Sequence, residues 1–258
     1  MTKRLVVFFD EHTPQTVASY FNAHEPKRET AVDKFLIDFQ PHILGRGGDS
    51  LDLACISHWN RGKVKTVEGK RLHRDFDVFN QLLDKHDAIV KSTIKEKFFL
   101  TGNHEQWLDD LIEADPQSFE GFIELDANLG LTDRGYTIVE RRGIYSVGKL
   151  NFIHGDYKEG MPPAFHAKAV TQVFHRNVVY GHYHTEQAYT EISPADTRPV
   201  FAQSVGTMGH VNPAWRKNSP SMWVNSFFVA YIHDDGSFSP YLVRIVNGRF
   251  TFGGVTYK

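Results

Sequence analysis

Side chains that bind metal ions well follow five short apolar runs of the sequence. The runs RLVVFF, QPHIL, KFFL, KLNFI and NVVY are each followed, within a few residues, by Asp, Asn or His. These side chains belong to Asp10, His12, Asp49, Asn103, His154, His182 and His184. Carboxylate, amide and imidazole donors without a thiolate suit ions of the Mn, Fe or Zn kind. The set indicates a site for two divalent cations.

The elements that must position these side chains alternate between strands and helices. Helical spacing of apolar residues begins at Leu72 and at Trp107, and a further helix is expected over residues 164–175. Such alternation predicts an α/β fold with mostly parallel strands. In open α/β sheets, sites form beyond the carboxyl ends of the strands, so loops distant in sequence are expected to converge there.

We expect a single domain over residues 1–258. The stretch 57–75 is expected to be a lid insertion near the site, and residues 186–258 a β-rich C-terminal part. Glycines flank the candidate ligands, where tight strand-to-loop turns favour a residue without a side chain. These are Gly48, Gly102, Gly155 and Gly181.

Composition narrows the class of protein. The chain has 258 residues, 41% of them hydrophobic and 23% charged, as in an ordinary globular protein. A formal net charge of -2 argues against a generally basic nucleic-acid binder. One cysteine, Cys55, excludes an internal disulfide and favours a reducing compartment. The apolar run LVVFF is too short for a signal peptide or a membrane span, so a cytoplasmic location is expected.

Five short blocks together resemble a known family. The blocks DEH, GDSLD, GNHE, HGD and GHYH occur in this order between residues 10 and 184. They resemble the calcineurin-like metallophosphoesterases, whose pattern is DxH, GDxxD, GNH[DE], a lone His and GHxH. The segments FHAKAV and NVVYGHYH are similar to compact members often carried by bacteriophages. The resemblance implies an α/β/β/α sandwich and the hydrolysis of phosphate esters at a dinuclear metal centre.

The resemblance also implies a role for each matched residue. Asp10, His12 and His184 would hold one metal, Asn103, His154 and His182 the other, and Asp49 would bridge the two. Manganese is favoured, and Zn, Fe or Ni would also fit. A hydroxide that bridges the metals would attack the phosphorus atom. His104 would be the catalytic residue, which assists at the phosphate or the leaving group without binding metal.

Several other polar residues near the blocks have weaker signals. Asp52, Asp156 and Glu105 are expected to orient a ligand or a loop rather than touch a metal. Each of these residues, taken singly, also fits an ordinary helix cap or a solvated side chain. The candidates for substrate binding are Trp59, Arg61, Lys63, His58, His166, Tyr183 and His210.

Two features bear on the substrate. The protein phosphatases of this superfamily carry an arginine that binds the substrate phosphate, in a GDxVDRG block. The corresponding block here is GDSLDLA, which leans toward phosphodiesters, although Arg46 or a lid residue could substitute. The second feature is a basic segment from Arg61 to Arg74, with six Lys or Arg against the single acid Glu68. With Trp59 it could hold a nucleotide or a nucleic acid, or it could be a solvated loop.

The sequence therefore favours a metal-dependent phosphodiesterase. The alternatives are a phosphomonoesterase that acts on a nucleotide or a small metabolite, and a DNA or RNA nuclease. A scaffold without catalytic activity fits least, because no expected ligand is missing. The sequence predicts no membrane partner and does not indicate an oligomeric state.

Overall fold

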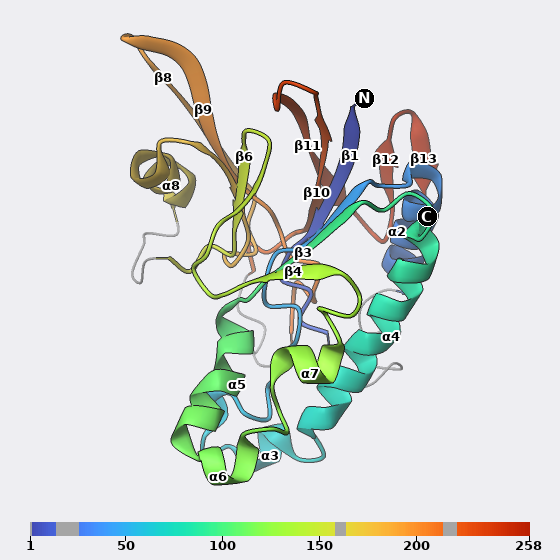
Figure 1. Ribbon diagram of the computed structural model, residues 1–258, viewed down its shortest axis with the longest axis vertical. Helices are drawn as coiled ribbons and strands as arrows, with labels where there is room; N and C mark the ends of the chain where they lie inside the picture. Colours follow the sequence, from blue (N-terminus) through green and yellow to red (C-terminus); the bar gives the residue numbers. More distant parts are fainter. Residues whose placement is uncertain (1, 14–25, 158–163, 214–220) are drawn as a thin grey trace.

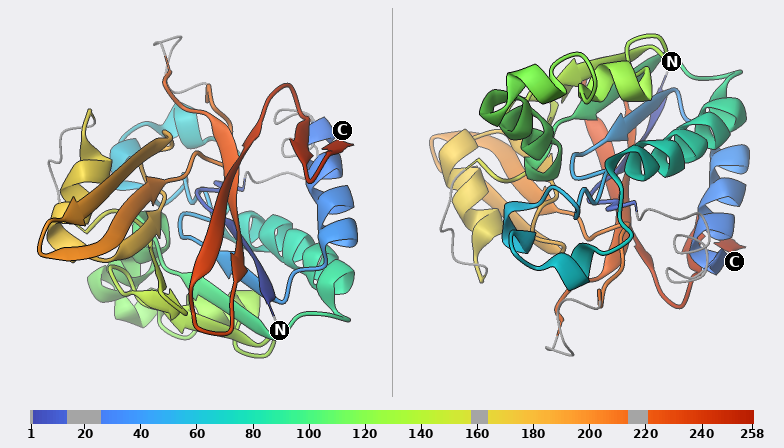
Figure 2. Two further views of the ribbon diagram at one scale, coloured as in Figure 1. Left: turned by 90° about the horizontal axis from the view of Figure 1, so that it is seen from above. Right: turned by 90° about the horizontal axis from the view of Figure 1, so that it is seen from below.

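The computed structural model describes residues 2–13, 26–157, 164–213 and 221–258. Two β-sheets lie face to face, and helices cover their outer faces (Figures 1 and 2). This arrangement confirms the predicted α/β/β/α sandwich.

The first sheet has six strands in the order β11-β10-β1-β2-β3-β4. Its four strands from the first part of the chain are parallel to one another, and the last two strands add antiparallel at the β1 edge. The strands are β1 (Lys3–Phe8), β2 (Ile43–Arg46), β3 (Glu96–Leu100), β4 (Tyr136–Val139), β10 (Asn225–Ile232) and β11 (Phe238–Ile245).

The second sheet has five strands in the order β5-β6-β7-β9-β8. Its centre, β6-β7-β9, is parallel, while β5 and β8 pair antiparallel at the two edges. The strands are β5 (Tyr145–Val147), β6 (Leu150–Ile153), β7 (Asn177–Tyr180), β8 (Gln187–Ser193) and β9 (Asp196–Ser204). A separate hairpin joins β12 (Phe250–Phe252) to β13 (Val255–Tyr257).

The helices lie on both outer faces of the sandwich. Those outside the first sheet are α2 (Pro26–Phe39), α4 (Leu72–Val90), α5 (Asn103–Ala114), α6 (Pro116–Phe119) and α7 (Leu125–Leu129). Outside the second sheet lies α8 (His166–Phe174), which packs on β6, β7 and β9. Two short turns of helix, η1 (His58–Asn60) and α3 (Val64–Val67), fall in the expected lid segment.

Alternating side chains of each strand explain the layers. In β1, Leu5 and Val7 point to the second sheet, where they join a buried cluster that includes Phe98 and Phe152. The intervening Val6 and Phe8 pack instead with α2. Because both faces of the strand are buried, β1 is an almost continuous apolar run, as expected for a parallel strand covered on both sides.

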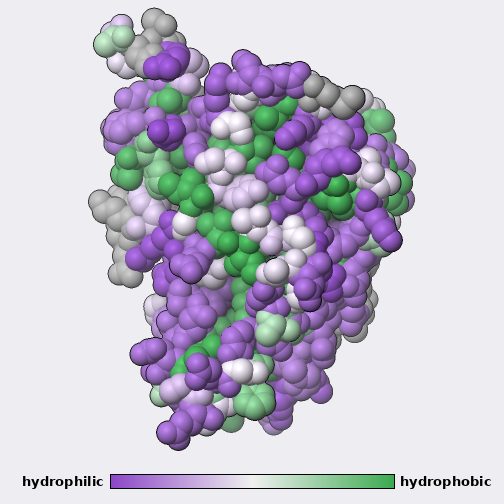
Figure 3. Space-filling model, viewed as in Figure 1, coloured by the Kyte–Doolittle hydropathy of each residue, from purple (hydrophilic) through white to green (hydrophobic). Residues whose placement is uncertain are grey.

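Two predicted helices begin and end for identifiable reasons. In α4, Phe76, Phe79 and Leu83 are buried, as their helical spacing predicts. Helix α5 starts directly after Gly102 and ends at Ala114, two residues before Pro116. None of the helices in the described ranges combines the length and the apolar composition needed to cross a bilayer. The face in Figure 3 is largely hydrophilic, with a narrow apolar band across it.

Candidate metal centre

The seven candidate ligands follow strands of both sheets. Asp10 and His12 follow β1, Asp49 follows β2, and Asn103 begins α5 three residues after β3 ends. The others come from the second sheet: His154 follows β6, and His182 and His184 follow β7. The loops converge at the carboxyl ends of the parallel strands, where α/β sheets place their sites.

One group of donors is formed by Asp10, His12 and His184. Their ligand atoms all lie within 4.8 Å of one another. The Nε2 atoms of His12 and His184 are 3.1 Å apart, and the same nitrogen of His184 is 3.2 Å from Oδ1 of Asp10. The three side chains therefore present their donor atoms to one small volume.

A second group is formed by Asp49, His154 and His182, whose ligand atoms also lie within 4.8 Å of one another. The Nε2 atom of His154 is 3.3 Å from Oδ2 of Asp49 and 3.1 Å from Oδ1 of Asn103. The amide oxygen of Asn103 thus joins this group.

Asp49 lies between the two groups. It belongs to the second, and it also forms a compact set with His12 and His104. Asp49 is therefore close to members of both groups, and its carboxylate has two oxygens.

His104 lies beside Asp49 with its ring held on two sides. Its Nδ1 is 2.8 Å from the main-chain oxygen of Asp52, and its ring contacts that of Trp107 at a centroid distance of 4.0 Å. Its Nε2 lies 4.0 Å from Oδ2 of Asp49. The side chain is partly exposed, and this nitrogen faces the cluster.

The backbone is strained at the candidate ligands. Five of them have left-handed φ angles: 51° at Asp10, 41° at His12, 50° at Asp49, 69° at His182 and 57° at His184. Each such backbone conformation costs about 1–3 kcal/mol of folding free energy and is kept only where the surrounding structure imposes it. Strain of this kind clusters at functional sites, and five of the ten non-glycine residues with left-handed φ angles in the described part of the chain are candidate ligands.

Glycines let the ligand-bearing loops approach one another. A Cβ atom on Gly102 would lie 2.2 Å from Oδ1 of Asp49, and one on Gly181 would lie 2.3 Å from Oδ2 of Asp10. Gly48 and Gly155 have φ angles of 91° and 126°, which favour glycine directly. The expected role of these glycines in tight turns thus extends to close packing of the loops.

Glu105 organises the loop that carries Asp49. Its buried carboxylate accepts hydrogen bonds from the backbone N–H groups of Gly102, Asp49, Ser50 and Leu51. Glu105 thus ties the loop after β2 to the start of α5.

The two other orienting candidates lie at the edge of the cluster. The main-chain oxygen of Asp52 accepts a hydrogen bond from Nδ1–H of His104. The carboxylate of Asp52 lies 3.6 Å from Nζ of Lys70. Asp156 is buried and lies 2.5 Å from Nε of Arg141. Neither carboxylate joins the compact donor sets.

The cluster has unusual proton affinities. Although burial opposes it, the charge of Asp49 raises the pKa of His154 to about 10. Burial likewise opposes ionisation of Asp49, yet the imidazoles of His154 and His104 hold its pKa well below the ordinary value. Burial, followed by the charge of His154, lowers the pKa of His182 to about 4.

These residues fit a metal centre. Oδ1 of Asp10 is buried and has no hydrogen-bond partner among the described residues, although it faces the imidazole of His184. A buried carboxylate oxygen left in this way needs a cation or a donor. Oxygen and imidazole donors are the ligands that Mn, Fe and Zn prefer.

The candidate substrate residues are placed differently from one another. Trp59 is 70% exposed, and Arg61 and Lys63 are also exposed. His58 lies between Trp59 and Trp107, at centroid distances of 4.4 and 5.7 Å. Through Trp107 this part of the segment 57–75 reaches His104.

The segment around His166 corrects one expectation. His166 is fully buried, and its nitrogens lie 2.7 Å from the hydroxyl of Tyr180 and 3.1 Å from that of Thr185. Its ring stacks on Tyr183 at 4.1 Å. It therefore supports the turn between His182 and His184 instead of lining a surface. His210 is half-buried, and its Nδ1 accepts a hydrogen bond from the backbone of Asn212.

Arg46 is not available to a substrate. Its guanidinium is fully buried, 2.5 Å from Oε1 of Glu11 and 2.8 Å from Nδ1 of His86. The sequence had allowed it to take the place of the missing phosphate-binding arginine, and its burial shows that this idea was wrong.

Some residues near the cluster were not anticipated. Trp107 lies on the same face of α5 as His104, three residues away, a spacing that the sequence displays. Trp223 contacts the ring of His184 at 4.1 Å, but it is distant in sequence and carries no signal. Arg141 and Arg142, in the loop after β4, both approach Asp156.

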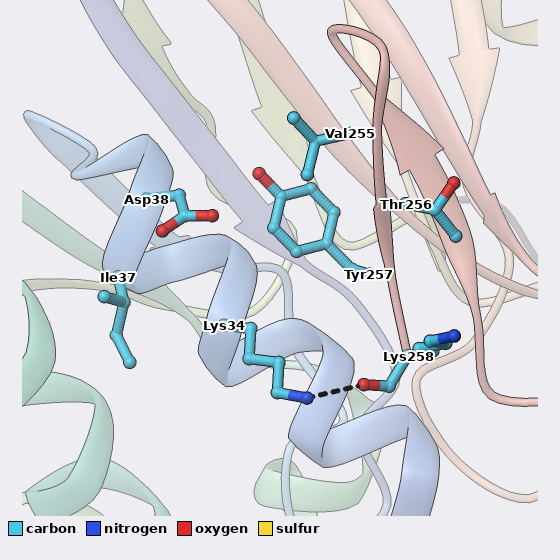
Figure 4. A pocket seen from close by; sticks show the side chains of 7 residues that line it. All are labelled: Lys34, Ile37, Asp38, Val255, Thr256, Tyr257 and Lys258. Atoms are coloured by element: carbon cyan, nitrogen blue, oxygen red, sulfur yellow. Dashed lines mark hydrogen bonds between the residues drawn. The ribbon is translucent and has the colours of Figure 1, made fainter.

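A shallow groove elsewhere contains none of these residues. It is lined by α2 and the hairpin β12–β13, where Nζ of Lys34 donates to the main-chain oxygen of Lys258 at 2.8 Å (Figure 4). We assign it no function.

Comparisons with known proteins give little further guidance. No protein-family model matches the sequence, and no curated protein matches it. A dimetal phosphatase from Danio rerio is similar in structure at 12% identity, over 94% of this chain and 95% of that chain, with a TM-score of 0.39. Another solved structure is 11% identical over 93% of this chain and 99% of that one, with a TM-score of 0.36. Similarities at this level carry no argument about function.

Proposed function

We propose that the chain is a hydrolase of phosphate esters that uses two divalent metal ions. The observation that carries the proposal is the convergence of two donor groups on either side of Asp49, with His104 beside them. The five sequence blocks that supply these residues place the chain, in our proposal, among the calcineurin-like metallophosphoesterases.

Each residue has a task in this proposal. Asp10, His12 and His184 would hold one cation, Asn103, His154 and His182 the other, and Asp49 would contact both. Two such ions would supply positive charge at the phosphoryl group and lower the pKa of a bound water.

His104 acts on the substrate rather than on the metals. A main-chain oxygen only accepts hydrogen bonds, so the contact with Asp52 places the ring proton of neutral His104 on Nδ1. The other nitrogen, Nε2, faces the cluster. When protonated, Nε2 can donate to a phosphoryl oxygen or give its proton to the departing alkoxide. Trp107 keeps the ring in this orientation.

We favour phosphodiesters as substrates. The block GDSLDLA contains no arginine for the extra charge of a monoester. Arg46, two residues before the block, is buried in an ion pair and does not replace it. The exposed segment with Trp59, Arg61 and Lys63 offers an aromatic face and positive charge near His104, which suits a nucleotide or a single-stranded nucleic acid.

One observation favours the alternative, a phosphomonoesterase. Arg141 and Arg142 lie in the loop after β4, and their partner Asp156 is two residues from His154. A guanidinium at this position could bind the second charge of a monoester. Under this alternative, Arg141→Ala would lower kcat/KM for monoesters much more than for diesters.

The test is to strip the protein of metal and reload it with Mn, Zn, Ni, Mg or Fe. Chromogenic phosphodiester and phosphomonoester substrates are then compared for each metal, with the Asp49→Asn variant as the control for contaminating phosphatases. We expect activity that requires metal, is higher on diesters and is lost in the variant. Absence of metal uptake by the parent protein, or activity that persists in Asp49→Asn, would refute the proposal.

A further inference from the structure

A buried ion pair lies directly behind the candidate metal centre. Arg46 is the last residue of β2, and its side chain points to the helix-covered face of the first sheet. There its guanidinium lies against the rings of Phe8 and Phe79, at 5.3 and 5.8 Å. Its Nη1 is 2.5 Å from Oε1 of Glu11, which is also buried.

Glu11 connects the two turns that carry candidate ligands. It stands between Asp10 and His12, both of which have left-handed backbone angles. Its second oxygen, Oε2, accepts a hydrogen bond from the hydroxyl of Ser50 at 3.3 Å, and Ser50 directly follows Asp49. One carboxylate thus holds both turns on the side that faces away from the donor cluster.

The ion pair is anchored in turn by the helices. Nη2 of Arg46 lies 2.8 Å from Nδ1 of His86 in α4. A guanidinium only donates, so Nδ1 accepts and neutral His86 carries its proton on Nε2. That nitrogen faces Oδ1 of Asp33 in α2 at 3.4 Å, and Asp33 also binds Lys85. A chain of polar contacts therefore runs from the outer helices to the turn after β1.

Stability alone is a poor reason for such a pair. Desolvation of two charges offsets most of their attraction, and well-packed apolar residues often replace a buried ion pair without loss of stability. What the pair supplies is a fixed geometry, because the planar guanidinium has its donors in set directions.

We propose that Glu11 and Arg46 are positioning residues for the metal centre, which hold the turns of Asp10, His12 and Asp49 in register from behind. This inference rests on the proposed function. It predicts that the pair matters for metal affinity more than for folding.

The double variant Glu11→Gln/Arg46→Met tests it by removing both charges while keeping similar volume. The matched control is Asp87→Asn/Lys97→Met, which removes an ion pair of 2.8 Å between α4 and the start of β3, at the opposite end of that strand from the site. For each protein we would measure the Tm of the metal-free form and the metal affinity by competition with a chromogenic chelator. Hydrogen exchange of the metal-free form would follow the backbone amides of Asp10, His12 and Thr13, which bond across to the loop after β2.

We expect the double variant to keep its metal-free Tm and to bind metal about 10–100-fold more weakly, the usual effect of losing a residue that orients a ligand. Its amides at residues 10–13 should exchange faster than in the parent, while the control keeps parental affinity and exchange there. Parental affinity and parental exchange in the double variant would overturn the inference.

Two further outcomes are also decisive. If the double variant does not fold, the single variant Glu11→Gln keeps the shape of the side chain and should show the same two changes to a smaller degree; if it folds without them, the inference is wrong. If the parent itself binds no metal, the proposed function fails. The exchange measurement then decides alone whether the pair holds the turns.

Discussion

Nδ1 of His104 lies 2.8 Å from the main-chain oxygen of Asp52. This contact determines which nitrogen of the ring faces the metal centre. The carbonyl accepts a hydrogen bond from Nδ1–H. Nε2 therefore points toward Asp49. In our proposal, His104 can therefore exchange protons with a substrate without disturbing the metals.

Replacing His104 with Ala should leave two metals bound and lower kcat by about 10²–10⁴-fold, the usual contribution of a general acid or base. Elemental analysis and steady-state kinetics of the reloaded variant check this. His233→Ala is the control, since His233 follows β10 beside Lys3, at the opposite end of β1 from the cluster, and should affect kcat little. Loss of metal from the His104 variant would make His104 a ligand.

The close approach of two loops at Gly181 gives a second prediction. In Gly181→Ala the new Cβ would meet Oδ2 of Asp10 at 2.3 Å, so the loops must separate. We expect a destabilisation of about 1–3 kcal/mol, as for other overpacked sites, together with loss of at least one metal.

The control for this variant is Gly62→Ala. Gly62 has open space around it and a φ of 75°, so alanine there should cost about 1 kcal/mol of backbone strain and leave metal content unchanged. Metal content by elemental analysis separates the two effects. Full occupancy in Gly181→Ala would mean that the close packing of the loops does not matter for the site.

A third prediction concerns protons. Asp49 raises the pKa of His154 to about 10, so at pH 8 this ring carries a proton in the metal-free protein. A protonated imidazole cannot bind a cation, so metal uptake must release about one proton per chain from this residue. The apparent affinity should therefore rise with pH up to about 10.

Calorimetry of metal binding at pH 8, in two buffers of different ionisation enthalpy, measures the protons released. An apparent binding enthalpy that is the same in both buffers would show that no proton leaves, and His154 would then not be protonated in the metal-free site.

The basic segment near Trp59 gives a fourth prediction. If it binds phosphates, changing Arg61, Lys63 and Lys65 to Gln should weaken the binding of single-stranded nucleic acid. The slope of log affinity against log salt should fall by roughly 0.7 for each contact that is lost. Lys70 is left unchanged because its ammonium lies 3.6 Å from the carboxylate of Asp52, whose main chain holds His104.

The control for the segment removes three exposed lysines at the opposite ends of the strands, Lys3, Lys91 and Lys95. This control changes the net charge by the same amount and should not alter the slope of log affinity against log salt. Turnover of a small diester should be parental in both triple variants. Equal salt dependence in both would identify the segment as an ordinary solvated loop and leave a small diester as the substrate class.

Much of the site could be found from the sequence, because the blocks place polar residues directly after apolar strands. Strands of a parallel sheet end at one edge, so Asp10, Asp49 and Asn103 had to approach one another. The alternation of strands and helices predicted the α/β fold and the main helices, whereas the two-sheet sandwich was implied by the resemblance of the five blocks to a known family. What the blocks could not show is how each side chain is held.

The missed features depend on contacts between distant parts of the chain. Glu105 reads as a helix-start residue, and only the folded loop shows its four backbone partners. Arg46 precedes two glycines, a pattern typical of a loop. In the structure it is the last residue of β2, and the alternation of side chains along the strand directs its guanidinium into the core. His166 was expected to bind substrate because nothing in the sequence reveals that it is buried in α8 against Tyr183.

The central claim is that two cations share Asp49. Crystals of the protein loaded with Mn, measured at a wavelength where Mn scatters anomalously, test it most directly. We predict two anomalous peaks per chain about 3.5–4 Å apart, one beside Asp10, His12 and His184 and the other beside Asn103, His154 and His182, with Asp49 in contact with both. A single peak, or an Asp49 carboxylate more than about 5 Å from every peak, would contradict it, since ligand distances are near 2 Å.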